Sequence, residues 1–336
     1  MTKSRVTNLD LMVHGLIFLR IAILCALFVL AYICWVEGGL FLTPSLIIYF
    51  LYCMLWNTWG FSGIGHELVH NSPFRSDIAN KTYLWLVSLL TLSNKNLFFI
   101  THFAHHKVPH SSDDFESPST FNSEKQNHFL IITLNSLFDL RKFINFIRYM
   151  TLNVFRYIPI PKMVDFLKRK KRFDDVIWNA RVILGYLIAV IGISIIFNTT
   201  ILMIFLIIPN FIGTGLAKSL VLLQHPTANY LRGLGITQIE FGGKSQSLGE
   251  FDDNFIRDKL DIKIPLFISF FYANMNYHAS HHYCSTVPFF HLPSESDSNV
   301  RNGLVGRIEI SKYQIYQLCF ALNRRVGKKI NIKHTR

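Results

Sequence analysis

Long apolar segments restrict this 336-residue chain to a membrane architecture. The first, residues 16–35, is almost unbroken Leu, Ile, Val, Ala, Cys and Phe, with Arg20 near its start. A run of about 20 such residues matches the hydrocarbon thickness of a bilayer. Half of all residues are hydrophobic and only 16% are charged, which is unusual for a soluble domain. We expect a single all-α integral membrane domain covering residues 1–336.

The apolar segments pair into two hairpins, and their turns lack basic residues. The loop from Phe61 to Arg181 contains sixteen Lys or Arg, and the tail after Leu223 contains fourteen. By the positive-inside rule the two turns face away from the cytoplasm. The predicted transmembrane helices are 16–35, 40–59, 182–197 and 201–223, with cytoplasmic regions at 61–181 and 224–336.

The region between the hairpins does not look like a separate domain. Residues 83–92 are too few to span a bilayer, and residues 129–157 mix apolar with basic side chains. Such segments are typical of helices that lie at the interface or cover a cytoplasmic site. The basic run 168–172 is either a docking patch or a solvated charge run. We therefore expect interfacial helices and a cytoplasmic, His-rich cap.

The net charge of +13 is explained by the basic residues that set this orientation and that contact anionic membrane lipids. We expect no nucleic-acid partner.

Three short histidine clusters lie in the predicted cytoplasmic regions. Steps of three and four residues bring side chains to one face of a helix, so each cluster can present several imidazoles together. A ninth candidate, His225, lies at the cytoplasmic end of the fourth span. The clusters are HELVH (His66, His70), HFAHH (His102, His105, His106) and HASHH (His278, His281, His282).

The number of histidines indicates two metal ions. Neutral imidazoles bind Zn, Fe, Cu and Ni, so the ligand type does not name the metal. Eight clustered histidines exceed the needs of one four-coordinate zinc ion. Because the number of spans is even, all three clusters lie on the same side of the membrane and can meet. Two irons side by side could hold and activate dioxygen.

Two other functions compete with this interpretation. The segment His66–His70 also fits HExxH, in which two histidines bind zinc and Glu67 would be the general base of a metallopeptidase. That function leaves HFAHH and HASHH unexplained. Metal transport or storage would favour ligands inside the spans, whereas these histidines lie just outside them.

The chain resembles the membrane fatty acid desaturase superfamily, whose three histidine boxes read HxxxH, HxxHH and HxxHH. HELVHNSPFRS at 66–76 is similar to the first box and the residues that follow it. NYHASHHYCSTVPFFHLP at 276–293 is similar to a third box followed by Val-Pro and Leu-Pro. The paired hairpins are also those of the family, so the resemblance covers roughly residues 16–293.

This resemblance implies a pair of iron ions (Fe²⁺/Fe³⁺), with O2 as co-substrate and a lipid or fatty-acyl chain as substrate. It implies either desaturation or hydroxylation, because the same ligand set serves both reactions in the family. The implied metal ligands are His66, His70, His102, His105, His106, His225, His278, His281 and His282.

Acidic and amide residues near the boxes are candidates to orient the ligands, since a ligating imidazole usually donates its other N–H to an oxygen. They are Glu67, Asp113, Asp114, Glu116, Asn274 and Asn276.

Electrons must come from a separate carrier, because the segments outside the resemblance are too short for a fused haem or flavin domain. A basic cytoplasmic surface favours an acidic ferredoxin, flavodoxin or cytochrome b5. The bias toward Lys, Asn, Ile and Phe indicates an AT-rich, bacterial genome. We therefore expect a multi-pass protein of the bacterial cytoplasmic membrane rather than the endoplasmic reticulum.

Overall fold

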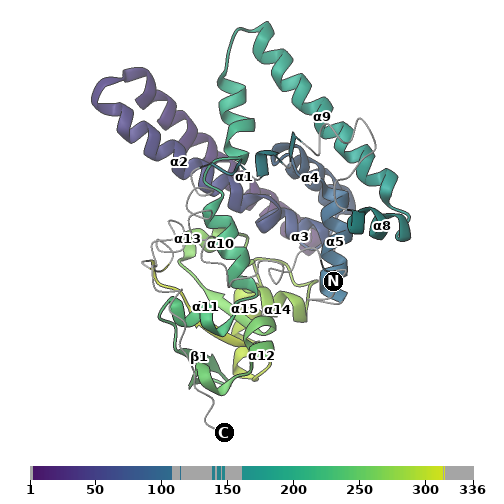
Figure 1. The fold of residues 1–336 in the computed structure, drawn as a ribbon, viewed down its shortest axis with the longest axis vertical. Coiled ribbons are helices and arrows are strands. Elements are labelled where there is room, and N and C mark those ends of the chain that lie inside the picture. The colour runs from purple at the N-terminus through teal and green to yellow at the C-terminus, as the bar shows by residue number, and fades with distance from the viewer. Residues whose placement is uncertain are drawn as a thin grey trace.

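The computed structural model describes residues 3–107, 114, 138–140, 142–144, 146–147, 161–312 and 314. This described part is mostly helical, as expected, with one small β-sheet. Figure 1 shows long helices at the upper end of the molecule and the sheet with its short helices at the lower end. Most of the predicted interfacial segment 129–157 lies outside the described residues, and α8 (Pro161–Arg169) follows it.

Three stretches of helix are long and apolar enough to cross a membrane, and they overlap the first three predicted spans. The long helices are α1 (Lys3–Glu37), α2 (Leu42–Trp59) and α9 (Phe173–Ile196). The candidate spans within or across them are Leu9–Glu37, Gly39–Val69 and Phe173–Ile196. A short 3-10 turn, Gly39–Phe41, lies between α1 and α2 and closes the first hairpin.

The second span continues beyond its predicted end into the first histidine cluster. A π-helical turn, Gly60–Ile64, joins α2 to α3 (Gly65–Val69). At Gly63 the backbone leaves helical geometry, and a Cβ atom there would lie 2.3 Å from the Thr58 carbonyl oxygen. Only glycine fits such an approach, so Gly63 permits the kink that redirects the chain toward His66.

The fourth predicted span, 201–223, differs from expectation because it is not one continuous helix. It contains a π-helical turn (Met203–Ile207), a 3-10 turn (Ile208–Asn210) and then α10 (Gly215–Gln224). Pro209 has no N–H to donate. Gly213 has φ +69° and approaches the Met54 backbone closely. These two residues break the helix within an otherwise apolar segment.

Two asparagine side chains satisfy the backbone freed by this break. The Asn57 amide nitrogen lies 2.8 Å from the carbonyl oxygens of both Pro209 and Ile212. The Asn210 amide donates to the Leu206 carbonyl at 2.8 Å. Trp56 donates to the Asn210 side-chain oxygen at 3.2 Å. Irregular backbone at membrane depth requires this kind of internal partner.

The second histidine cluster lies on a helix that turns sharply from its neighbour. α4 (Asp77–Leu90) and α5 (Lys95–Lys107) are bent by 109° relative to each other. The two helices are long and apolar enough to cross a membrane only when they are taken together. Asn94 accepts the backbone N–H of Leu97 at 2.9 Å and donates to the Val176 carbonyl at 2.8 Å. It thus caps α5 and ties that helix to α9.

The lower lobe contains a four-stranded sheet that the sequence analysis did not predict. The strand order is β2-β1-β4-β3, antiparallel except for the parallel pair β3–β4. Each strand has only four residues, too few for a clear alternating pattern. The strands are β1 (Gln238–Phe241), β2 (Lys244–Ser247), β3 (Leu260–Lys263) and β4 (Gly306–Glu309). The lobe's helices are α11 (Ala228–Gly233), the 3-10 turn Leu248–Glu250, α12 (Asp253–Asp258), α13 (Leu266–Phe271), α14 (His278–Tyr283) and α15 (Leu292–Arg301).

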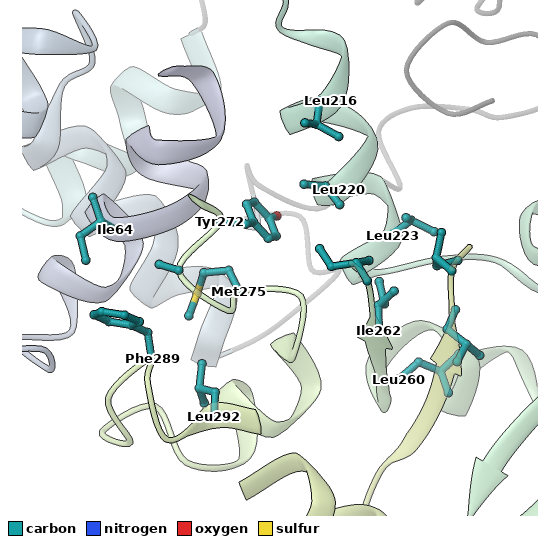
Figure 2. Close-up of a cluster of buried hydrophobic side chains, with 14 of the residues drawn as sticks. Ile64, Leu216, Leu220, Leu223, Leu260, Ile262, Tyr272, Met275, Phe289 and Leu292 are labelled. Carbon is teal, nitrogen blue, oxygen red and sulfur yellow. The ribbon is translucent and has the colours of Figure 1, made fainter. Parts of the chain in front are cut away.

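A hydrophobic core joins this lobe to the membrane helices (Figure 2). Leu216, Leu220 and Leu223 share one face of α10 and are buried. They belong to the same cluster as Leu260 and Ile262 of β3. Burying such side chains contributes roughly 1.5–3 kcal/mol each. The core therefore holds the end of α10 against β3 and the segments around α14.

Arg20, the one charge inside the first apolar segment, is only 1% exposed. Its Nε donates to the Phe270 carbonyl at the end of α13 (2.8 Å), and its guanidinium lies 4.1 Å from the Phe270 ring centroid. A cation is favourable at a helix C-terminus and over an aromatic face. Arg20 therefore anchors the lobe to the first span.

We predict that Asn57→Leu lowers the free energy of unfolding by about 1–3 kcal/mol, because the Pro209 and Ile212 carbonyls lose their donor in apolar surroundings. Denaturant unfolding of the detergent-solubilised protein measures this change. Asn302→Leu, at an exposed position, is the control and should leave stability nearly unchanged. Equal stability of both variants would contradict the role given to Asn57.

Candidate metal centre

Four separate segments bring all nine predicted histidines together. His66 lies in α3 and His70 at its end, while His102, His105 and His106 lie in the last turns of α5. His278, His281 and His282 lie in α14, and His225 ends α10. The kink at Gly63, the bend before α5 and the core behind α10 position these segments.

The nine rings divide into two groups. Within each group the nitrogens that could hold an ion lie within 4.8 Å of one another. One group has five members and the other has four. They are His66, His70, His102, His106 and His281, and then His105, His225, His278 and His282.

The two HxxHH clusters are shared crosswise between the groups. In α5 the i,i+4 pair His102 and His106 joins the group of five, while His105 joins the group of four. α14 does the reverse, because His278 and His282 join the group of four and His281 joins the group of five. Residues four apart share a helix face, and the residue between them points elsewhere. Each short helix therefore serves both groups.

Every one of the nine rings directs Nε2 inward. The Nε2 atoms of His66 and His281 are 3.2 Å apart, and those of His70 and His102 are 2.8 Å apart. In the other group the pair His105–His225 is separated by 3.1 Å. Nitrogens bound at about 2.1 Å to one cation lie roughly 3.0–3.4 Å apart. The donor set and its spacing therefore fit two metal ions.

Burial favours the neutral form of the rings in the third cluster and of His70. It lowers the pKa of His278, His281 and His282 well below the ordinary imidazole range, and the neighbouring imidazoles lower it further. Burial also lowers the pKa of His70 to about 4. A neutral imidazole offers a lone pair to a cation.

Among the described residues, His105 and His225 have an oxygen partner on the outer nitrogen. His105 Nδ1 lies 2.9 Å from Asp114 Oδ2, and His225 Nδ1 lies 3.1 Å from the Arg257 carbonyl oxygen. These acceptors place the proton on Nδ1, so that Nε2 presents its lone pair to the group. Asp114 thus has the orienting position expected of it. Asp113 and Glu116 lie outside the described residues.

The other residues expected to orient a ligand either donate a hydrogen bond to a backbone carbonyl or lie near a histidine just beyond hydrogen-bond length. Asn274 donates to the Phe289 carbonyl at 2.8 Å, and Asn276 to the Ile262 carbonyl at 2.6 Å. Both fix the chain before α14. Glu67 is buried behind His281, with Oε1 3.6 Å from His281 Nδ1.

Asp261 is a supporting residue that the sequence analysis missed. It is fully buried on β3 and accepts the backbone N–H (3.0 Å) and hydroxyl (2.5 Å) of Ser280, inside the third cluster. Asn299 donates to the same Ser280 hydroxyl at 3.1 Å. Asp261 lies seventeen residues before His278 in a strand too short to predict, so no local sequence signal marks it.

A cavity of about 490 Å³ adjoins the centre at His70. Its walls combine apolar residues such as Leu9 and Phe74 with polar ones such as Arg75. Leu9 begins the first candidate span. The cavity therefore extends from His70, a candidate metal ligand, to the beginning of the first candidate span.

The comparison with protein families identifies one match. The profile of the family described as Fatty acid desaturase matches residues 39–302. This range is more than half of the chain and contains all nine histidines. A comparison with curated proteins finds no match.

We predict that His105→Ala lowers the bound metal content, because the ring contributes to the group of four and is oriented by Asp114. Metal analysis of the purified protein measures this loss, and circular dichroism checks that the helices persist. His291→Ala, at an exposed position, is the control and should retain metal. A zinc peptidase built on HELVH alone would tolerate loss of His105.

Proposed function

This chain belongs to the fatty acid desaturase family, an oxidoreductase family, and we propose that it introduces a double bond into a fatty-acyl chain. The proposed enzyme is a membrane-bound, non-haem di-iron oxidoreductase that uses dioxygen. The observation that carries this proposal is the convergence of nine Nε2 atoms into groups of five and four beside long apolar helices.

The group of five histidines would hold one iron and the group of four the other. A bound iron pair supplies the activation of dioxygen that attack on an unactivated C–H bond requires. The donor set supports iron among the metals that accept several neutral imidazoles.

The side chains of this protein contribute position and exclusion of water. Asp114 and the Arg257 carbonyl fix the ring orientation of two proposed ligands. Burial of the rings removes competing water from the ligand side. The product then depends on which substrate carbon is held against the centre.

The cavity beside His70 supports a lipid substrate. Leu9, at the start of the first span, and Phe74 are among the residues that line it, so an acyl chain could approach from the membrane boundary.

The position of Glu67 argues against the peptidase alternative. A general base must reach a water molecule on the open side of the metal. Glu67 instead lies behind the His281 ring and is fully buried.

We further propose that an external carrier, such as a ferredoxin, flavodoxin or cytochrome b5, donates the electrons on the cytoplasmic side of a bacterial membrane. The positive-inside distribution of basic residues and the net charge of +13 support this orientation and an acidic partner.

The product identifies the reaction. The protein is reconstituted in lipid with an electron-donor system, its iron is counted, and lipid products are analysed by mass spectrometry. Desaturation removes two hydrogen atoms, and this is the expected result. Gain of one oxygen atom would instead establish hydroxylation at the same centre. Bound zinc with peptide cleavage would refute both.

We predict that turnover with an acidic protein donor falls as ionic strength rises from about 0.01 M to about 0.15 M, because salt screens the attraction that docks the donor. Initial rates across this range measure the effect. Turnover driven by a small chemical reductant is the control and should change little. Salt-independent turnover with a competent protein donor would contradict docking by charge.

A further inference from the structure

Glu67, between the two histidines of the first cluster, has one carboxylate oxygen fully engaged. Oε2 accepts the Ser72 hydroxyl and the backbone N–H of Phe289, each at 3.0 Å. Ser72 follows the first cluster and Phe289 follows the third. The carboxylate therefore joins the loops behind both clusters, and its side chain is 0% exposed.

The second carboxylate oxygen and the nearest histidine form an unmatched pair. Glu67 Oε1 and His281 Nδ1 are both buried without a hydrogen-bond partner. They lie 3.6 Å apart, just beyond hydrogen-bond length. Buried polar atoms are costly when unpaired, and each of these two atoms can satisfy the other.

The orientation of His281 determines which of its nitrogens can donate. Nε2 points into the group of five and lies 3.2 Å from Nε2 of His66. If Nε2 gives its lone pair to a cation, the ring proton must be on Nδ1, facing Glu67. His105 and His225 already have this arrangement with an oxygen behind each ring.

We infer that Glu67 is a positioning residue for the metal centre, accepting a hydrogen bond from His281 Nδ1–H when Nε2 binds an ion. The carboxylate then fixes the His281 tautomer and raises the basicity of the ligating nitrogen. Its bonds to Ser72 and Phe289 hold it at this distance. This inference rests on the proposed metal centre and not on the identity of the lipid substrate.

This role differs from the one that HExxH predicts. In a zinc peptidase the glutamate acts on water at the metal, so its amide variant keeps the metal and loses catalysis. Here the carboxylate acts through a ligand, so its amide variant should bind metal more weakly. Metal affinity therefore separates the two roles without any substrate.

The test is the affinity of the full-length, metal-stripped protein in detergent for Fe²⁺ under anaerobic conditions. Glu67→Gln keeps the side-chain volume but replaces one acceptor oxygen with an NH2 donor, and we expect its affinity to fall 10- to 100-fold. Glu67→Asp keeps both acceptor oxygens and should recover part of the loss. The visible absorption of the Co²⁺-loaded protein should also change in Glu67→Gln.

Glu309→Gln is the matched control. It makes the same side-chain change at an exposed glutamate of β4, whose carboxylate lies 3.6 Å from Lys263 Nζ. We expect its Fe²⁺ affinity and Co²⁺ spectrum to match those of the natural protein. Thermal unfolding of each metal-free variant checks that the fold persists.

Unchanged affinity and an unchanged Co²⁺ spectrum in Glu67→Gln would overturn the inference. If that variant does not fold, an experimental structure of the iron-loaded natural protein decides. A Glu67 Oε1 to His281 Nδ1 distance below about 3.2 Å supports the inference, and a distance that stays longer overturns it. Absence of any lipid product, with weaker metal binding in Glu67→Gln, would refute only the proposed function.

Discussion

Nine imidazole rings share one largely buried space, and all of them present the same nitrogen inward. Charged imidazolium groups could not be packed so closely away from water. Each ring also needs its orientation fixed, since rotation would replace a lone pair with a proton. Asp114 and the Arg257 carbonyl supply this support to two rings, and Asp261 holds Ser280 within the third cluster.

The rest of the fold can be understood as the framework that this packing requires. Segments far apart in sequence must end at one place, so the chain breaks its helices where a straight continuation would miss it. Gly63 redirects the second span, and Asn94 begins α5 at its new angle. The interrupted fourth span delivers α10, whose buried leucines align His225 with the lobe. At the break in 201–223 and at the bend before α5, amide side chains pair with the backbone.

The grouping of the rings could be predicted from the histidine spacing, because helical geometry alone relates residues three and four apart. Proximity to the second cluster made Asp114 one of several acidic candidates, together with Asp113 and Glu116. Asp261 could not be found this way, since its contact with Ser280 depends on a strand pairing formed only in the folded lobe. Hydropathy likewise located the apolar segment 201–223 but could not locate its break. That break depends on Asn57 in another span.

The crosswise sharing of histidines has a consequence for how the centre fills. α5 and α14 each supply ligands to both groups, so an ion entering one group restrains the helices that form the other. The two groups are therefore coupled through α5 and α14, whichever of them an ion occupies first.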